Sequence, residues 1–454
     1  MKSQVLGLDE NKLTGTIPTE MSDMVNLKYL SLQNSEHDAG KITGTLPSFA
    51  DQVFLADLYL DGNDMTGTIP SDFLAHSNVT DKVVTVGLKD NQLSGSIPKE
   101  LTIFDRLHID LARNEITAIP NRLCKKKMWM SGEVELYGCD AILCPKGTYH
   151  KIGRQASNSA EGSCQSCWNG EDGAPFYGAE KCNRIYEDSD NELGVGDGSA
   201  ELGDAGNDVG TNGDAEKAMV DSAHKTQQIL VEFALSLGWK KWKDSSGWED
   251  ALEHIDKTED TIDLVLDYCS FFGVTCFGDD SGMVTSIDLP RNNLKGLVPP
   301  HLFTLLSLGK VDLSYNKVQL DDFKSFGMLG FAKNLKSLLL DQTDITSWHN
   351  VGLATELEEL SLNDVYFDSE ISEEIFSLRK LKVLRCQFAG LKGELQTKIG
   401  QLTQLERLNL YGNRIDSTIP TELGLLSKLR ILDCEFCGMH SQENSSSPPS
   451  LSLT

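Results

Sequence analysis

The residues whose types and spacing could do chemistry in this sequence are its cysteines. Cys164 and Cys167 form a Cys-x-x-Cys pair, with Cys144 before it and Cys182 after it. Four thiolates at such spacing could hold a structural zinc ion. The same four could instead form disulfides, which stabilise segments too short to build a hydrophobic core. We favour disulfides, because the neighbouring segments also have features typical of extracellular proteins.

Catalytic motifs are absent from the sequence. It contains no His-Glu-x-x-His, no Gly-x-Ser-x-Gly and no glycine-rich phosphate loop before a Lys. The 41 Lys and Arg against 68 Asp and Glu give a net charge of −27, which argues against nucleic-acid binding. No apolar run is long enough to span a membrane. We therefore expect a binding protein without a catalytic site, a cofactor or a metal ion.

A short pattern of apolar residues recurs along the chain. Two alternating apolar residues such as Leu58 and Leu60 are followed by Asn63, and often by Gly and Ile-Pro. Residues on a strand alternate between its faces, so both leucines point inward and the intervening residues point outward. The Asn amide can satisfy backbone groups of the turn that follows. One such unit cannot bury its own core, so neighbouring units must stack into a solenoid.

The pattern resembles the leucine-rich repeat, and segments such as Leu13-Thr14-Gly15-Thr16-Ile17-Pro18 resemble its plant-type subclass. The resemblance implies an α/β solenoid, with two repeat arrays whose parallel sheets line a concave face. Residues 269–276, which read Cys-Ser-Phe-Phe-Gly-Val-Thr-Cys, resemble the N-terminal cap of that family. This implies a disulfide between Cys269 and Cys276, and a role for Trp239, Trp242 and Trp248 in packing the cap. The helix that opens the cap is expected at residues 223–237, and a second at 249–256.

Residues 144–149, which read Cys-Pro-Lys-Gly-Thr-Tyr, resemble small ephrin-receptor-like modules of extracellular proteins. We expect disulfides Cys144–Cys164 and Cys167–Cys182, and also Cys124–Cys139, although six cysteines allow fifteen pairings. The other three of the eleven cysteines occupy repeat positions and are expected to be buried thiols: Cys386, Cys434 and Cys437.

Six segments follow from these patterns. They are array 1 (residues 1–143), a Cys-rich module (144–182), an acidic Gly-rich linker (183–222), the helical cap (223–283), array 2 (284–439) and a disordered tail (440–454). Within the linker, residues 187–216 carry ten acidic residues, seven Gly and no Lys or Arg. Because array 1 ends in a Cys-rich closure and array 2 opens with its own cap, we expect two separate solenoids.

The outward residues of the concave strands are the candidate ligand contacts. The stripe formed by Arg385, Phe388, Arg407 and Tyr411 is preferred, because aromatic residues and Arg are enriched among interface anchors. Tyr315, Arg291 and Tyr59 complete the predicted site. Glu135 and Tyr137 are also placed on this face.

The family resemblance implies a secreted or cell-surface recognition protein that binds a protein, peptide or glycan, with a co-receptor as a further partner. The alternative is an adhesive matrix protein, with calcium bound by the acidic linker at residues 203–208. Rows of Thr are too irregular for an ice- or mineral-binding face. Asn78 and Asn444 lie in glycosylation triplets. Array 1 begins without a signal peptide or cap and array 2 stops within a repeat, so we expect both signal and anchor to lie outside this chain.

Overall fold

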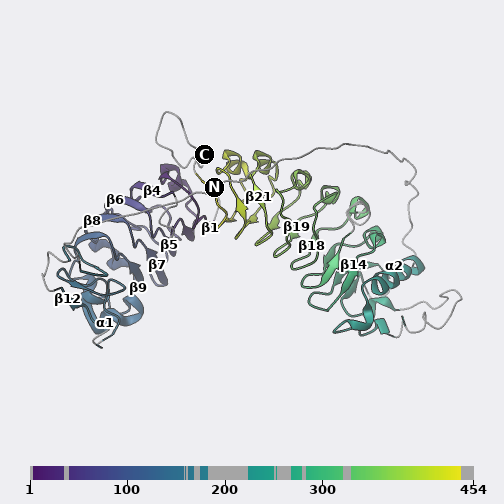
Figure 1. The fold of residues 1–454 in the computed structure, drawn as a ribbon, viewed down its shortest axis with the longest axis horizontal. Helices are drawn as coiled ribbons and strands as arrows, with labels where there is room; N and C mark the ends of the chain where they lie inside the picture. The colour runs from purple at the N-terminus through teal and green to yellow at the C-terminus, as the bar shows by residue number, and fades with distance from the viewer. Residues whose placement is uncertain are drawn as a thin grey trace, which may run out of the picture.

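The computed structural model describes residues 4–34, 40–157, 159, 162–167, 174–182, 223–249, 252, 267–278, 283–320 and 329–440. These residues form an arch of stacked repeats whose inner surface is lined by one long sheet (Figure 1). The predicted acidic linker with its calcium alternative, most of the second cap helix, Asn444 and nearly all of the tail lie outside the described residues.

One sheet of 13 strands lines the concave face. Its strands pair in parallel, except that β13 is antiparallel to β14. In spatial order the strands are β13 (Val274–Cys276), β14 (Val284–Asp288), β16 (Lys310–Asp312), β18 (Ser337–Leu339), β19 (Glu359–Ser361), β20 (Val383–Arg385), β22 (Arg407–Asn409), β24 (Ile431–Asp433), β1 (Val5–Gly7), β3 (Tyr29–Ser31), β5 (Asp57–Tyr59), β7 (Val83–Gly87) and β9 (Arg106–Asp110).

The inward residues of these strands build the core. Leu58 is 1% exposed and Leu60 is fully buried, and equivalent residues of the other repeats pack into the same continuous cluster. Each repeat thus buries its apolar residues against its two neighbours, as the period-two pattern of the sequence predicts.

Shorter elements return the chain along the other side of each repeat. Array 1 has a second parallel sheet of β10 (Glu115–Ala118), β8 (Gln92–Ser96), β6 (Asp64–Thr68), β4 (Ile42–Thr45) and β2 (Gly15–Thr16). In the described part of array 2, the corresponding strands form the pairs β15 (Lys295–Leu297) with β17 (Lys317–Gln319), and β21 (Lys392–Gly393) with β23 (Arg414–Ile415).

Short 3₁₀ helices follow the second sheet, and several begin directly after a Pro of the repeat motif, such as Pro18, Pro98 or Pro420. Proline suits this place because it fixes φ and needs no backbone donor. The 3₁₀ helices of the repeats are Thr19–Asp23, Lys99–Ile103, Pro300–Thr304, Leu329–Phe331, Val351–Leu353, Glu373–Ser377, Thr397–Gln401 and Thr421–Leu425.

The two arrays meet in the middle of the arch. Strand β1 of array 1 pairs with β24 of array 2, with Val5 opposite Ile431 and Gly7 opposite Asp433. The backbone N–H of Lys12 donates to the carbonyl of Met439 over 2.6 Å, which continues the pairing beyond the strands. We call this contact the seam. In Figure 1 the purple start of the chain lies beside the yellow-green end of array 2.

The prediction of two separate solenoids is therefore wrong. The first strand of array 1 and the last strand of array 2 would each leave an apolar edge in a separate solenoid, and here the two edges cover one another. Periodicity identifies each repeat but does not say which repeats are neighbours in space. The spatial order is cap, array 2, array 1 and Cys-rich module, which differs from the order along the chain.

Each end of the combined solenoid is closed differently. The cap begins with α2 (Ala223–Ser236), close to the predicted helix, and continues with 3₁₀ helices Trp239–Lys241 and Tyr268–Ser270. Trp248 is fully buried, between Trp242 and Phe271. The tryptophans thus pack the cap, as expected.

At the opposite end lie α1 (Glu133–Tyr137), 3₁₀ helices Leu123–Lys125, Trp129–Gly132 and Gly138–Ala141, and the hairpin β11 (Thr148–Tyr149) with β12 (Gln165–Ser166). The placement of Glu135 and Tyr137 on a concave strand is wrong, because both lie on helix α1.

Disulfides bond ten cysteines. The four predicted pairs are confirmed: Cys124–Cys139, Cys144–Cys164, Cys167–Cys182 and Cys269–Cys276. With all four sulfurs of the module paired, the zinc alternative has no thiolates left. A fifth disulfide, Cys434–Cys437, corrects the prediction that these two are buried thiols. The turn after β24 brings their Cα atoms to 5.4 Å, a normal distance for a disulfide. Cys386 is a buried free thiol, as predicted.

Candidate functional site

A ladder of asparagines holds the turn after most of the concave strands. The Asn413 side chain donates to the carbonyl of Cys386 over 2.7 Å and to that of Leu410 over 2.6 Å. Its Oδ1 accepts from the backbone N–H groups of Ala389 at 3.1 Å and Leu391 at 3.0 Å. One buried amide thus satisfies backbone groups of two neighbouring repeats, which fixes the turn in both.

The residue just before each ladder position has a left-handed backbone. Its φ is 49° at Phe388, 55° at Phe436 and 61° at Tyr315. This conformation is unfavourable for residues other than glycine, so the surrounding hydrogen bonds must maintain it. These side chains lie at the edge of the concave sheet, where Phe388 is 53% and Phe436 is 51% exposed.

Three aromatic side chains meet at this edge in array 2. Tyr411 makes edge-to-face contacts with Phe388, at a ring-centroid distance of 5.1 Å, and with Phe436, at 5.7 Å. We call Phe388, Tyr411 and Phe436 the aromatic edge. Because two of the rings are about half exposed, an apolar partner that covers them would gain burial energy. The predicted site contained Phe388 and Tyr411 but not Phe436, although Phe436 occupies the same repeat position as Phe388.

The two predicted arginines differ in their surroundings. Arg385 forms an ion pair with Glu359 at 2.6 Å, so its charge is already compensated. Arg407 on β22 is exposed and forms no ion pair within the described part of the chain. Arg407 is therefore the better candidate for an anionic group of a ligand.

The remaining predicted residues lie elsewhere on the concave side. Arg291 stacks over the ring of Tyr315 at 3.9 Å, near the cap. Tyr59 contacts Tyr29 across β5 and β3, with ring centroids 5.7 Å apart. The seven predicted residues therefore divide among three places, and only Arg385, Phe388, Arg407 and Tyr411 lie on the adjacent repeats of β20 and β22.

Buried carboxyl groups gather at the seam, which the sequence analysis did not identify. Asp9 is 4% exposed and faces Glu435, and the Tyr29 hydroxyl donates to Glu435 Oε1 over 3.2 Å. Glu435 lies over Gly7, where a Cβ atom would approach Glu435 Oε1 to 2.5 Å. Burial, reinforced by Asp9 and Asp433, raises the pKa of Glu435 to about 8. In the sequence, the repeat register places Gly7 and Asp9 on the outward face, but it does not show that Glu435 is their neighbour. That follows only from the pairing of β1 with β24.

Array 1 repeats this arrangement three strands further along the sheet. Asp61 lies over Gly87, where a Cβ would approach Asp61 Oδ2 to 2.1 Å. Burial raises the pKa of Asp61 to about 6, against the opposing effect of a hydrogen bond from the Lys89 backbone N–H. Burial also raises the pKa of Asp110. The concave face of array 1 is thus lined by partly buried carboxyl groups, whereas that of array 2 carries exposed aromatic rings.

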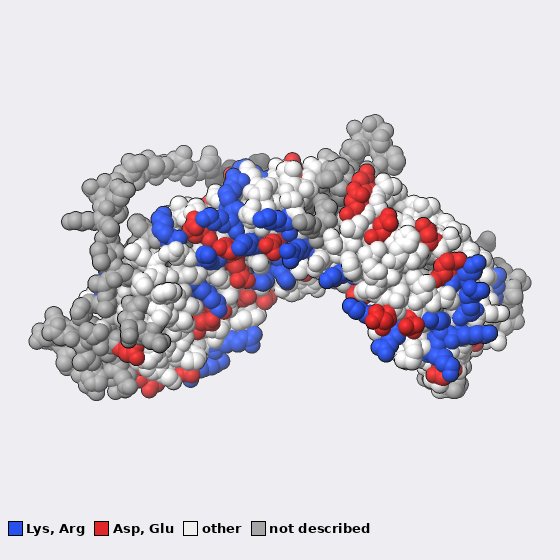
Figure 2. Space-filling view, turned by 180° about the vertical axis from the view of Figure 1, so that it is seen from behind, with Lys and Arg blue, Asp and Glu red and all other residues white. Residues whose placement is uncertain are grey.

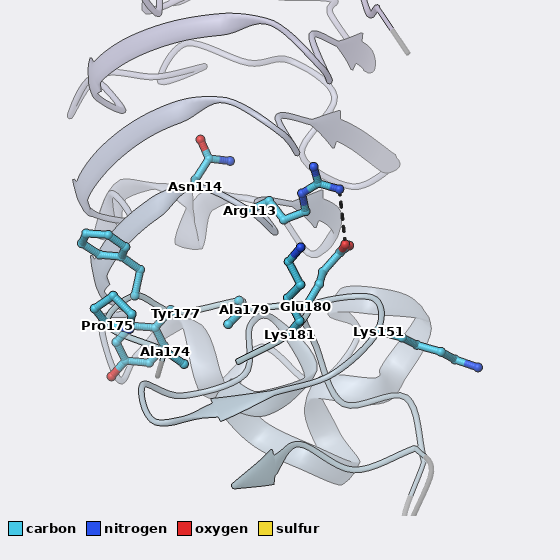
Figure 3. A pocket seen from close by; sticks show the side chains of 11 residues that line it. Arg113, Asn114, Lys151, Ala174, Pro175, Tyr177, Ala179, Glu180 and Lys181 are labelled. Carbon is cyan, nitrogen blue, oxygen red and sulfur yellow. Dashed lines mark ion pairs between the residues drawn. The ribbon is translucent and has the colours of Figure 1, made fainter. Parts of the chain in front are cut away.

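A cavity of about 470 Å³ lies between the last repeat and the Cys-rich module (Figure 3). Arg113 faces Glu180 across it at 3.5 Å and pairs with Asp90 at 2.5 Å. Lys89 pairs with Glu180 at 2.6 Å. Arg113 and Lys89 are compensated by carboxylates of the chain itself, so this network attaches the module to the solenoid. Lys151 and Lys181, which also line the cavity, are exposed and form no ion pair within the described residues.

Three further sites can be placed or tested on the structure. Asn78 is exposed, as a glycosylated residue must be, whereas Asn444 is not described. Among the described residues, no three His, Cys, Asp or Glu side chains are arranged to hold a metal ion. A helix long and apolar enough to cross a bilayer does not occur among them either.

Comparisons with known proteins identify the repeat. The family model described as Leucine Rich Repeat matches residues 404–426. Receptor-like protein kinase 7 of Arabidopsis thaliana is 29% identical over 159 residues, which cover 29% of this chain and 16% of that protein. This chain therefore matches less than a fifth of the length of its curated relative.

Solved structures with the same type of fold include plant ectodomains. The leucine-rich-repeat ectodomain of the receptor kinase GASSHO1/SCHENGEN3 from Arabidopsis thaliana, in complex with CASPARIAN STRIP INTEGRITY FACTOR 2, is 17% identical. The match covers 96% of this chain and 39% of that one, with a TM-score of 0.31. A plant ice-binding protein is 20% identical over 47% of this chain and 71% of its own, with a TM-score of 0.35.

Proposed function

This chain is a leucine-rich-repeat protein of the plant type, and from that premise we propose that it is an extracellular recognition protein without catalytic activity. Its ligand is a protein, peptide or glycan that binds at the concave side of array 2. The observation that carries the proposal is the aromatic edge, which exposes two rings at about half of their surface on a rigid turn. Large aromatic side chains held in place are typical anchors of recognition surfaces, because binding costs them little conformational entropy.

The charged residues in the same array as the aromatic edge support its role in ligand recognition. Arg407 lies exposed on β22, four residues before Tyr411, and offers a cation on the same repeat. A ligand that reaches from the rings to Arg407 would carry an anionic group about 13 Å from its apolar group. The ligand therefore has an apolar or sugar-ring face and a negative group.

The cysteines support an extracellular location. Five disulfides occur in the described residues, and they cluster in the Cys-rich module, the cap and the seam. Such bonds persist in oxidising compartments and are rare in the cytosol. Arg385, Tyr315, Arg291 and Tyr59 remain proposed as flanking contacts, and a co-receptor remains a proposed partner.

A selection experiment tests the proposal. The disulfide-bonded protein is offered a displayed random peptide library and, in parallel, an array of plant-wall oligosaccharides. We expect at least one peptide or glycan family to be enriched, and its affinity to fall about a hundredfold when Phe388→Ala and Phe436→Ala are combined, because each anchor contributes on the order of 1–2 kcal/mol.

The matched control is Leu425→Ala, which removes an apolar side chain that is 62% exposed on a 3₁₀ helix away from the concave sheet. This variant should bind as the parent protein does. Equal losses in the control, or ligands whose affinity ignores Phe388 and Phe436, would contradict the proposed site.

A further inference from the structure

A groove rich in lysine lies where the cap meets the first repeat of array 2, far from the aromatic edge. Its cavity of about 510 Å³ is lined by Leu235, Gly238, Trp239, Lys240, Lys241, Asn293, Lys295 and Lys317. We call Lys240, Lys241, Lys295 and Lys317 the lysine groove. All four side chains are exposed, and among the described residues no carboxylate lines the cavity, although the whole chain has a net charge of −27.

Two of these lysines are direct neighbours in a sheet. Strands β15 and β17 are parallel, and Lys295 lies opposite Lys317. Adjacent strands are about 4.8 Å apart, so the two ammonium groups repel one another unless an anion lies between them. Asp344 follows Lys317 in the next repeat, but no ion pair joins them. Within the described part of the chain, Lys241, Lys295 and Lys317 form no ion pair with any carboxylate.

Most other lysines described in array 2 behave differently. They pair with a carboxylate of the neighbouring repeat, as Lys380 does with Glu356 at 2.5 Å and Lys392 with Asp368 at 3.3 Å. Figure 2 shows the result, with basic and acidic side chains side by side over these repeats. Lys241, Lys295 and Lys317 depart from this pattern within the described residues. The lysine groove also differs from the cavity of Figure 3, whose Arg113 is compensated by two carboxylates.

The backbone beneath the lysines is held in place by the cap. The N–H of Lys295 donates to the carbonyl of Leu237 over 3.1 Å, and the Asn293 side chain donates to the carbonyl of Lys241 over 2.6 Å. At Gly296, a Cβ atom would lie 2.2 Å from the carbonyl oxygen of Ser236, so only glycine permits this close approach. The charges are therefore mounted on a rigid frame formed by both elements.

We propose that the lysine groove binds a linear polyuronate, a polysaccharide that carries a carboxylate on every sugar. The spacing of Lys295 and Lys317, about one strand separation, is comparable to the length of one sugar residue. The flexible ammonium groups of Lys241, Lys295 and Lys317, without an Arg, suit repeated single charges rather than one fixed phosphate, which favours bidentate guanidinium groups. Leu235, 54% exposed, supplies an apolar rim for sugar-ring faces. Nucleic acid is disfavoured by the negative charge of the rest of the chain.

The experiment measures the affinity of the whole disulfide-bonded protein for a uronic-acid oligomer by calorimetry, with a chelator present and at two salt concentrations. The test variant combines Lys295→Gln and Lys317→Gln. The matched control combines Lys380→Gln and Lys382→Gln, which removes the same charge from exposed lysines that have glutamate partners. We expect the dissociation constant to rise about tenfold or more in the test variant and to change less than about twofold in the control.

Three comparison compounds complete the test. The methyl-esterified oligomer keeps the sugar backbone without its charges and should not bind, and inorganic phosphate should not compete. Poly-glutamate should bind at least about tenfold more weakly than the oligomer. Equal affinity of test and control variants would overturn the proposal, as would equal binding of the ester or of poly-glutamate. The variant with Phe388→Ala and Phe436→Ala should bind the oligomer normally, which separates this groove from the concave ligand site.

Discussion

Array 1 and array 2 share one repeat but differ in how regularly they follow it. In array 1 the ladder asparagines are nearly continuous, the second sheet has five strands and the concave face is lined by partly buried carboxyl groups. In array 2 the ladder is interrupted at Thr343, Val365 and Ala389, and the described residues of the second sheet form two pairs of strands. Exposed aromatic rings stand at its edge. The comparison teaches that regular repeats build the scaffold, whereas irregular ones leave room for recognition.

The largest effect should come from the ladder. Asn413 is the amide that follows three repeats without one, and four of its hydrogen bonds to backbone groups are 3.1 Å or shorter. In Asn413→Ala the two N–H groups and two carbonyls lose a buried partner, so local stability should fall by about 3 kcal/mol. Hydrogen exchange of the repeats around residues 389–415 measures this loss.

Asn91→Ala in array 1 provides the comparison. Its neighbours Asn63 and Asn114 remain in place, and the five-stranded sheet holds the same turns from the other side. A smaller loss than in Asn413→Ala is expected. An equal or larger loss would show that the two arrays do not differ in robustness.

A somewhat smaller effect is expected on ligand affinity, which should differ between variants of the concave surface of array 1 and variants of the aromatic edge of array 2. Tyr29→Ala combined with Tyr59→Ala removes the stacked pair of array 1. If recognition belongs to the aromatic edge, a selected ligand should lose less than about threefold in affinity, against about a hundredfold for Phe388→Ala with Phe436→Ala. Calorimetry with both variants decides the matter, since comparable losses would place the ligand across both arrays.

The seam should make stability depend on pH. Burial raises the pKa of Glu435 to about 8, so between about pH 4.5 and 8 the folded state binds more protons than the unfolded state. The free energy of unfolding should therefore fall as pH rises through this window. Denaturant midpoints between pH 5.5 and 8.5 measure the slope, which Glu435→Gln should flatten.

Asp61 should also make the free energy of unfolding fall with rising pH, but only up to about pH 6, because burial raises its pKa to about 6. Asp61→Asn should flatten the slope below about pH 6, and the exposed control Glu20→Gln should leave the whole curve unchanged. If Glu435→Gln keeps the parent slope above pH 6, the seam is not closed as described.

The smallest expected effect concerns the number of free thiols in the protein. With Cys434 and Cys437 joined, Cys386 is the single free cysteine, and burial raises the pKa of its thiol. Thiol titration should find none in the native protein and one after unfolding without reductant. Three thiols after unfolding would mean that the disulfide beside the seam is absent.

The sequence predicted much of the fold, and its errors have physical causes. Alternation of Leu58 and Leu60 predicted the strands, and the resemblance of two segments to known Cys-containing modules led to the four expected disulfides, because both depend on residues close in sequence. The seam joins Val5 to Ile431, which no periodicity connects. The Cys434–Cys437 bond was missed because each residue fitted a repeat position on its own.

The candidate site was only partly predictable for the same reason. Phe388 and Tyr411 followed from the outward register of single strands. Phe436 has the same outward register, but register alone does not show that its ring meets Tyr411. Asp9 and Glu435 acquire a common environment only when the two arrays meet, and the partner of Arg385 depends on the side-chain conformation of Glu359. The repeat register shows on which face of the sheet a residue lies. It does not show which residues from distant parts of the chain pack against it.

Hydrogen–deuterium exchange with a selected ligand tests the central claim most directly. Saturating ligand should slow exchange in the turns that carry Phe388, Tyr411 and Phe436, while the strands of array 1 and the cap exchange as before. Protection confined to array 1 around residues 57–61 and 85–90, with none at the aromatic edge, would contradict the assignment of recognition to array 2.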